Sequence, residues 1–474
     1  MKIRLTRPRV PSALSPKEWA AIFIAFVAIG LPCAARSAEL APCRAESTVF
    51  DGWQAEQLSN SWVTLTIVPE LGGRLMQVSF GRHAFLFVNP EYRGKIVPPQ
   101  NDASPRRWIN YGGDKVWPMP EGTKDEQHWP GPLSGPLDDG GYAPRVLSRQ
   151  PDCAVELTGP PDPLTGLQYS RDIRIGSGSP EVFFHAVMKN VTGHPLRWSM
   201  QSVTQYDTAD ASHPGDYNHD FHAFTPANPQ SAYLDGYHVA YGPAHDPSFS
   251  ISNGLFSLHW LYLGSEVWVD SPGDWVAVVD GSSQYAMIER FHRQTAASYP
   301  GKATVIFYTN GPAIRLASQG APEMTPADPV GTPYYMEAEL NSPLVDLAPG
   351  GAYAMDTEWF PTRLEGPLSA VTYAGAVSQP LQATSAGSQV HLSGSFGVFF
   401  PGELVAVFYG AGGARAGTIR LASASPLRAV NLQQTVTPPV GAVRVSLHLQ
   451  NASGLDLGSL GEAWINAPSE GKNR

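Results

Sequence analysis

The sequence predicts an all-β protein, made of one large antiparallel β-sandwich and a smaller one after it. The composition is rich in turn formers, with 46 Gly and 44 Pro and only 16% charged residues. From residue 50 to about 360, short segments rich in β-branched and aromatic residues recur, each ended by Gly, Pro, Asn or Asp. No stretch beyond the first 38 residues shows a sustained helical period with caps. Many short strands at close spacing are typical of a sandwich.

The first 38 residues read as a targeting segment. Basic residues at positions 2–17 precede an apolar run at 20–31, which is shorter than the ~20 residues that a membrane-spanning helix needs. Small residues follow at 33–38, as signal peptidase requires before its cut. We therefore expect a signal peptide at 1–38 and export to the periplasm or the extracellular space, without stable membrane insertion after cleavage. An uncleaved anchor is the alternative, which Pro32 and the short apolar run disfavour.

The charge balance excludes some partners. Removing residues 1–38 takes away six Lys/Arg and one acidic residue, so the net charge falls from −10 to −15. An acidic chain without a basic stripe is unsuited to nucleic acid or to anionic membrane surfaces. Two cysteines remain, Cys43 and Cys153, and an even pair in an oxidising compartment favours one disulfide. Two separate thiols are the alternative.

No cofactor is expected, because the sequence contains no P-loop, no dinucleotide fingerprint and no nucleophile elbow. His219 and His222 lie among aspartates, but they lack a defined third ligand, so we expect no metal site.

We divide the remaining chain into two β domains, 39–365 and 366–474, because it exceeds one ordinary core. Between the strands of the first domain, residues 89–145 are dense in Pro, Gly and Trp and predict a long functional loop. After residue 362 the chain becomes rich in Ala, Gly, Ser and Val. Alternating segments such as 389–393 and 442–447 predict a small β-sandwich there.

Three segments carry the functional argument. Residues 67–75 read as a strand, a turn with Gly72-Gly73-Arg74 and a second strand. Residues 110–118 contain Asn110-Tyr111-Gly112-Gly113-Asp114-Lys115 and Trp117. Residues 336–359 contain Glu337 and Glu339, a Leu-Ala-Pro-Gly turn and an aromatic strand.

In this order the segments resemble the galactose mutarotase-like (aldose 1-epimerase) superfamily, and most closely an uncharacterised family of secreted bacterial proteins within it. The resemblance covers roughly residues 50–365. It implies an antiparallel β-supersandwich that binds sugars on a concave sheet, followed here by the small C-terminal β-sandwich.

The resemblance also implies that Glu337 acts as a general base toward a sugar hydroxyl. Glu339 lies two residues on, so in a strand both carboxylates share one face. Like charges held close raise the pKa of one of them, which makes it useful in acid–base chemistry. A solvated edge strand with two exposed acids is the alternative.

The chain departs from the mutarotase pattern at two positions. Tyr111 stands where the family has a catalytic histidine before Gly-Gly, and Gln201 lies near the position of the second histidine. Glutamine does not transfer protons in ordinary catalysis, so plain mutarotation is in doubt. Tyr111 remains a candidate acid or base.

Other residues are candidates for binding. Lys115 could neutralise a sugar carboxylate or stabilise negative charge. Trp117, with Trp108 and Trp129, could stack on pyranose rings or simply pack under the loop. Arg171 begins a strand and could be a hydrogen-bond fork or a structural residue. Arg74, Asn110 and Gln201 complete this set.

The sequence therefore predicts an exported protein that binds a saccharide or glycan and could act on it through a carboxylate acid/base, as an epimerase or a glycosidase. A non-catalytic glycan-binding or structural protein is the first alternative. A polysaccharide lyase with Tyr111 as base, and Lys115 or Arg171 on a uronate, is the second.

Overall fold

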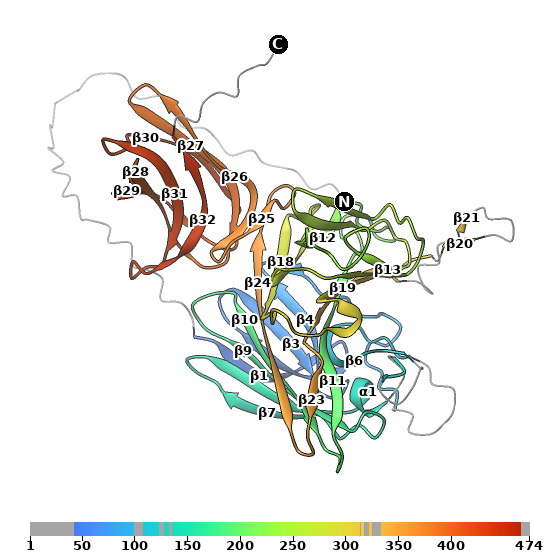
Figure 1. The fold of residues 1–474 in the computed structure, drawn as a ribbon. Coiled ribbons are helices and arrows are strands. Elements are labelled where there is room, and N and C mark those ends of the chain that lie inside the picture. The colour runs from blue at the N-terminus through green and yellow to red at the C-terminus, as the bar shows by residue number, and fades with distance from the viewer. Residues whose placement is uncertain are drawn as a thin grey trace, which may run out of the picture. The chain divides into compact units, whose positions relative to one another are not determined.

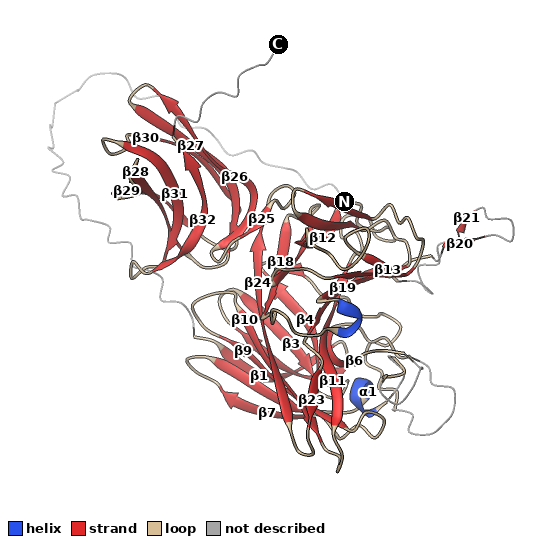
Figure 2. Ribbon diagram, in the orientation of Figure 1, coloured by secondary structure: helices blue, strands red, loops and turns tan. Residues whose placement is uncertain are grey.

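The computed structural model describes residues 42–98, 108–122, 128–131, 135–312, 314–316, 322–324 and 333–465. The predicted signal peptide lies outside these ranges. Within them the chain is almost entirely β (Figures 1 and 2), as the sequence predicts, with a one-turn helix α1 (Pro136–Asp139) and a 3-10 turn at Pro300–Lys302.

Two large antiparallel sheets form the first part of the chain (Figure 1). The twelve-stranded sheet runs in the order β1-β2-β3-β4-β6-β11-β22-β19-β16-β13, with β5 beside β4 and β23 beside β11. Its strands are β1 Arg44–Phe50, β2 Trp53–Ser59, β3 Val63–Val68, β4 Arg74–Phe80, β5 His83–Ala84, β6 Asp114–Met119, β11 Leu196–Asp207, β13 His238–Tyr241, β16 Ser265–Val269, β19 Val305–Thr309, β22 Tyr335–Asn341 and β23 Val345–Leu347.

The ten-stranded sheet runs in the order β14-β15-β12-β17-β18-β24-β10-β9-β8-β7. Its strands are β7 Ala143–Ser148, β8 Cys153–Thr158, β9 Leu167–Ile175, β10 Val182–Asn190, β12 Phe221–Pro226, β14 Phe249–Ser252, β15 Leu255–His259, β17 Trp275–Asp280, β18 Tyr285–Phe291 and β24 Ala352–Arg363. A separate pair is formed by β20 (Ile314–Leu316) and β21 (Pro322–Met324).

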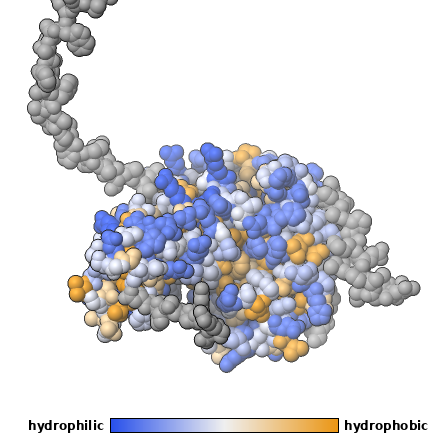
Figure 3. Space-filling model, turned by 90° about the horizontal axis from the view of Figure 1, so that it is seen from above, coloured by the Kyte–Doolittle hydropathy of each residue, from blue (hydrophilic) through white to orange (hydrophobic). Residues whose placement is uncertain are grey.

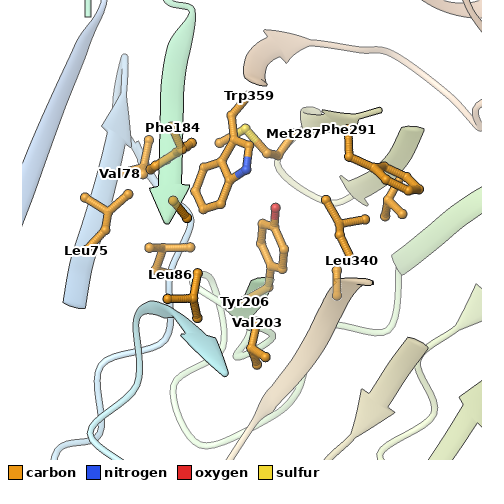
Figure 4. Packing of buried hydrophobic residues seen from close by; sticks show 14 of the residues in the cluster. Leu75, Val78, Leu86, Phe184, Val203, Tyr206, Met287, Phe291, Leu340 and Trp359 are labelled. Carbon is orange, nitrogen blue, oxygen red and sulfur yellow. The ribbon is translucent and has the colours of Figure 1, made fainter. Parts of the chain in front are cut away.

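The main core contains residues from both large sheets. In β10 buried and half-buried residues alternate, which is the period of a strand with one inward face. Figure 4 shows Trp359 of the ten-stranded sheet next to Tyr206 of the twelve-stranded sheet, in a buried cluster that also contains Phe184 and Leu340. The Phe184 and Trp359 rings lie 4.7 Å apart, centroid to centroid. The disulfide left open by the sequence is present, and it joins Cys43, just before β1, to Cys153 at the start of β8.

Residues from 370 onward form two four-stranded antiparallel sheets. One contains β25 Ala370–Val371, β26 Gly375–Ala386, β27 Gln389–Val398 and β30 Val430–Val436. The other contains β28 Gly402–Gly410, β29 Arg415–Ala424, β31 Ala442–Gln450 and β32 Asp456–Trp464. Their core has its own apolar residues, among them Phe396, Phe408 and Leu447. The domain limits at residues 38 and 365 remain predictions.

The prediction of a structureless loop over residues 89–145 is wrong in part. This region contains α1 and β6, and β6 pairs with β11 along its whole length. Pro118 masks the strand in the sequence, because proline cannot donate to a sheet ladder. Pro118 is tolerated at this position because β4 pairs with β6 through Leu75 and Asp114 alone. On its β4 side, Pro118 therefore has no partner strand to which a backbone N–H would have to donate.

On the face seen in Figure 3, hydrophobic residues form separate small patches among hydrophilic ones. In the part of the chain that the structure describes, no helix has the length and apolar character to cross a membrane.

Candidate functional site

A cleft of about 410 Å³ opens on the twelve-stranded sheet, on the face turned away from the core. The side chains of Val267 on β16, Phe307 on β19 and Ala338 on β22 point into the core. The residues directly before and after each of them line the cleft. This alternation is the two-residue period of a strand. The lining residues are Trp108, Trp117, Met119, Glu121, Gly122, Gln201, Ala240, Glu266, Trp268, Ile306, Tyr308, Glu337 and Glu339.

Strand register brings the two predicted carboxylates to the middle of this face. Glu337 on β22 lies opposite Gln205 of β11 on one side and opposite Tyr308 of β19 on the other. Glu339 lies opposite Val203 and Ile306. The prediction that Glu337 and Glu339 share a face agrees with this register. The alternative of an exposed edge strand is wrong, because β22 is a central strand.

Both carboxyl groups are buried and held by amides. Gln205 donates a hydrogen bond from Nε2 to Glu337 Oε1, and Gln201 donates from Nε2 to Glu339 Oε2 at 2.5 Å. Burial, and then the charge of Glu337, raises the pKa of Glu339 well above its ordinary value, and a hydrogen bond joins the two carboxyls. Glu339 is therefore protonated more readily than an ordinary glutamate.

Lys115 on β6 supplies a cation beside this pair. Its Nζ lies 4.2 Å from the centre of the Trp117 ring and 5.9 Å from that of Trp108. Burial, and then the charge of Arg74, lowers the pKa of Lys115 to about 8, while Glu337 acts in the opposite direction. Lys115 is thus mostly charged at pH 7. Among the described residues its ammonium has no hydrogen-bond partner.

Trp117 is fixed from behind by helix α1. Its Nε1 donates to Asp138 Oδ1 at 2.9 Å, and Arg74 donates from Nη2 to the same oxygen at 2.7 Å. The chain can approach this closely because Gly72 has φ +64°, and a Cβ there would lie 2.0 Å from the Asp138 carbonyl oxygen. The motif that contains Gly72 therefore supports the tryptophan.

Three functional candidates were missed in the sequence: Glu121, Glu266 and Trp268. Trp268 donates its Nε1 hydrogen to Glu266 Oε1. Desolvation, followed by the charges of Glu266 and Glu337, raises the pKa of Glu121 to about 7, and desolvation and Glu337 also raise the pKa of Glu266. The sequence does indicate two of them. Glu266 and Trp268 are two residues apart, on either side of Val267, so in a strand their side chains share one face. Glu121 follows β6 in irregular chain and gave no such signal.

The structure does not bring Tyr111 to the cleft. Its ring is buried in a separate apolar cluster, in edge contact with Trp53 and Tyr92, and its hydroxyl accepts a hydrogen bond from Val97 N at 2.8 Å. A residue packed in this way stabilises the loop, so its assignment as a catalytic base is corrected. Asn110 also lies outside the lining: its Oδ1 accepts from Gly112 N at 3.1 Å and so shapes the Gly-Gly turn.

Arg171, a candidate binding residue in the sequence, also lies outside the cleft. It projects from β9 into the core, where its guanidinium pairs with Asp114 and lies 4.4 Å from the centre of the Phe184 ring. Asp114 also accepts from Thr204 Oγ1 at 3.0 Å. Arg171 is thus a structural residue between the sheets. Arg74 is likewise fully buried against Asp138 and acts on the cleft through Trp117 and Lys115.

No group of three or more His, Cys, Asp or Glu side chains in the described ranges is arranged to hold a metal ion.

No family model matches the chain, and no curated protein matches it. Solved structures do. They include a TPR-domain containing protein from Parabacteroides distasonis, with 13% identity and a TM-score of 0.43 over 68% of this chain and 49% of that one, so this chain spans about half its length. They also include galactose mutarotase-like proteins from Clostridium acetobutylicum (9% identity, 68% of this chain and 99% of that one, TM-score 0.41) and Lactobacillus casei (9%, 64% and 99%, 0.41). Such matches were expected from the sequence resemblance; they concern the fold alone.

Proposed function

We propose that this protein is exported, binds a saccharide in the cleft and moves a proton on the bound sugar through Glu337 and Glu339. The observation that carries the proposal is a hydrogen-bonded carboxyl pair in a cleft lined by three tryptophans. Aromatic faces suit the C–H faces of pyranose rings, and carboxyl and amide groups suit sugar hydroxyls.

The two carboxyls have different roles because their environments differ. Glu339 holds the proton and serves as the acid, and Glu337, which faces the Lys115 cation, serves as the base. Pairs of titratable groups whose pKa values are pushed apart are the usual arrangement for acid–base chemistry near neutral pH.

The closeness of the pair argues against glycosidic cleavage by these two residues. Glycosidases hold their carboxyls about 5–9.5 Å apart, on either side of the scissile bond. Two carboxyls joined by a hydrogen bond are closer than this and act from one side of the sugar. A proton transfer at a hydroxyl or a ring carbon, as in epimerisation, fits this geometry. A Tyr111-based lyase receives no support, since neither Tyr111 nor Arg171 lies in the cleft.

Export is supported by the leader-like segment, by the acidic remainder and by the Cys43–Cys153 disulfide. It is tested by expressing the full sequence in a bacterial host and determining the N-terminus of the protein in the periplasm or medium. A start near residue 39 is expected, and an intact leader in the cytoplasm would refute export.

The function is tested by screening the protein from residue 39 onward on a glycan array, and by following the bound sugars by NMR for turnover. Glu337→Gln is expected to keep binding within about tenfold and to lower turnover at least a hundredfold, because an amide cannot serve as the base. Binding without turnover by the wild type would leave a glycan-binding protein. Absence of binding to any saccharide would remove the carbohydrate assignment.

A further inference from the structure

Charge is distributed unevenly along the cleft. Following the sheet order, Lys115 lies on β6, the Glu337–Glu339 pair lies on β22, and Glu266 lies on β16. Neighbouring strands are about 4.8 Å apart, so β6 and β16, four strands apart, are separated by roughly 19 Å across the sheet. Glu121 belongs with Glu266, since Glu266 is the strongest charge acting on it. The cleft therefore has a buried cation behind its β6 side and carboxyl groups in its lining on the β16 side.

On the β6 side, two buried polar groups lack hydrogen-bond partners among the described residues. These are the ammonium of Lys115, which is 3% exposed, and the Oε1 atom of Gln205, which is 0% exposed. Both residues act on Glu337, Gln205 by its hydrogen bond and Lys115 by its charge. One group is a donor and the other an acceptor. Both residues lie behind Glu337, which lines the cleft, and a carboxylate accepts a hydrogen bond from a hydroxyl, so this side suits a sugar hydroxyl at Glu337.

On the β16 side, Glu121 and Glu266 line the cleft, and the charge of His238 acts on Glu266. No lysine or arginine is found among the described residues that line the cleft. Both glutamates are accessible from the cleft, and the half-buried indole of Trp268 lies beside them, bonded to Glu266. An ammonium group placed here would gain charge-assisted hydrogen bonds from the carboxylates and attraction to the indole face.

On the basis of the proposed function, we infer that the saccharide is an amino sugar with a free ammonium group, which binds between Glu121, Glu266 and Trp268 while a hydroxyl meets the Glu337 end of the cleft. A uronate would place like charge beside these glutamates. An N-acetylated sugar would lose the ammonium and bury an amide there instead.

The inference is tested with three β-1,4-linked tetrasaccharides that differ only at C2: those of glucosamine, N-acetylglucosamine and glucose. Calorimetric titration of the protein from residue 39 onward at pH 7.5 is expected to show at least tenfold tighter binding of the glucosamine tetramer than of the other two. Glu266→Gln, and separately Glu121→Gln, should reduce this ratio several-fold. Glu403→Gln, a carboxylate on β28 of the C-terminal sandwich, is the matched control and should leave the ratio unchanged.

Circular dichroism confirms that each variant is folded. Equal affinity for the three tetramers, or a preference that neither cleft variant reduces, overturns the amino-sugar inference. Binding of only other, uncharged saccharides on the glycan array overturns it too, and these results leave the proposed function in place. If no saccharide of any kind binds, the proposed function itself fails.

Discussion

Two groups of ionisable side chains occupy opposite faces of the same sheet. On β6, Asp114 faces the core and Lys115 faces the cleft. On β11, Thr204 and Tyr206 donate hydrogen bonds to carboxyl groups in the core. Gln201 and Gln205 donate hydrogen bonds to the carboxyl groups of the cleft. The alternation of strand side chains thus sends one residue to a structural network and its neighbour to the candidate site.

The two groups differ in how their charges are matched. In the core, Arg171 neutralises Asp114, and Tyr206 donates to Glu289 at 2.5 Å. In the cleft, carboxyls face each other and amides, and the Lys115 ammonium is left without a hydrogen-bond partner among the described residues. Burial raises the pKa of Glu289 to about 8, so a shifted pKa occurs on both faces. Polar atoms without hydrogen-bond partners also occur on both faces, among them Arg171 Nε in the core. The candidate site is distinguished by the cleft that its carboxyl groups line.

The largest effect is expected from Arg171→Met. Removal of the cation leaves Asp114 buried without its partner, which should lower the free energy of unfolding by about 3–5 kcal/mol. Denaturant titration measures this, and folded protein should keep its saccharide affinity. Arg145→Met, at an exposed pair with Glu156, is the control and should leave the free energy of unfolding nearly unchanged, because solvent screens an exposed ion pair. Loss of binding in a fully stable Arg171→Met protein would place Arg171 in the site after all.

A smaller effect is expected from Gly72→Ala. The added Cβ meets the Asp138 carbonyl at 2.0 Å, in a left-handed backbone conformation, so α1 must shift and release Trp117. We expect a loss of about 2–3 kcal/mol in stability together with weaker saccharide binding. Gly350→Ala has a similar φ of +76° with nothing within 4 Å of the Cβ, so it should cost about 1 kcal/mol and leave binding intact. Equal binding by both variants would contradict the link between α1 and the cleft.

The core network also predicts a pH dependence. The pKa of Glu289 is raised by burial to about 8, so the folded protein binds a proton that the unfolded chain releases above its ordinary pKa near 4.5. Stability from this group is therefore present below about pH 4.5 and is lost as pH rises toward 8, by up to about 1.4 kcal/mol per pH unit. Glu289→Gln should flatten the decline in unfolding free energy between pH 5 and 8. An unchanged slope would show that Glu289 does not titrate in this range.

The smallest effect concerns Lys115. Lys115→Met removes the cation that faces Glu337 and keeps the packing against Trp117. Because the pKa of Lys115 is lowered to about 8, the wild type should lose turnover as pH rises through about 8, and Lys115→Met should lack this basic limb. A basic limb that persists unchanged in Lys115→Met would mean that the charge of Lys115 has no part in turnover.

The fold class followed from the sequence because strand periodicity and turn residues are local properties. Glu337 and Glu339 could be placed on one face for the same reason. Arg171 and Tyr111 could not be assigned correctly, because an arginine at a strand start or a tyrosine before Gly-Gly can face either the core or the site. Which one it faces depends on partners that are not its sequence neighbours, such as Asp114 for Arg171 and Val97 for Tyr111. Glu121 joins Glu266 only through the tertiary fold.

The most direct test of the central claim is a crystal structure of the protein from residue 39 onward, soaked with its tightest-binding saccharide from the array. We expect the sugar in the cleft between Trp117 and Trp268, with a hydroxyl at hydrogen-bond distance from Glu337. A sugar bound only on the C-terminal sandwich, or anywhere outside this cleft, would contradict it.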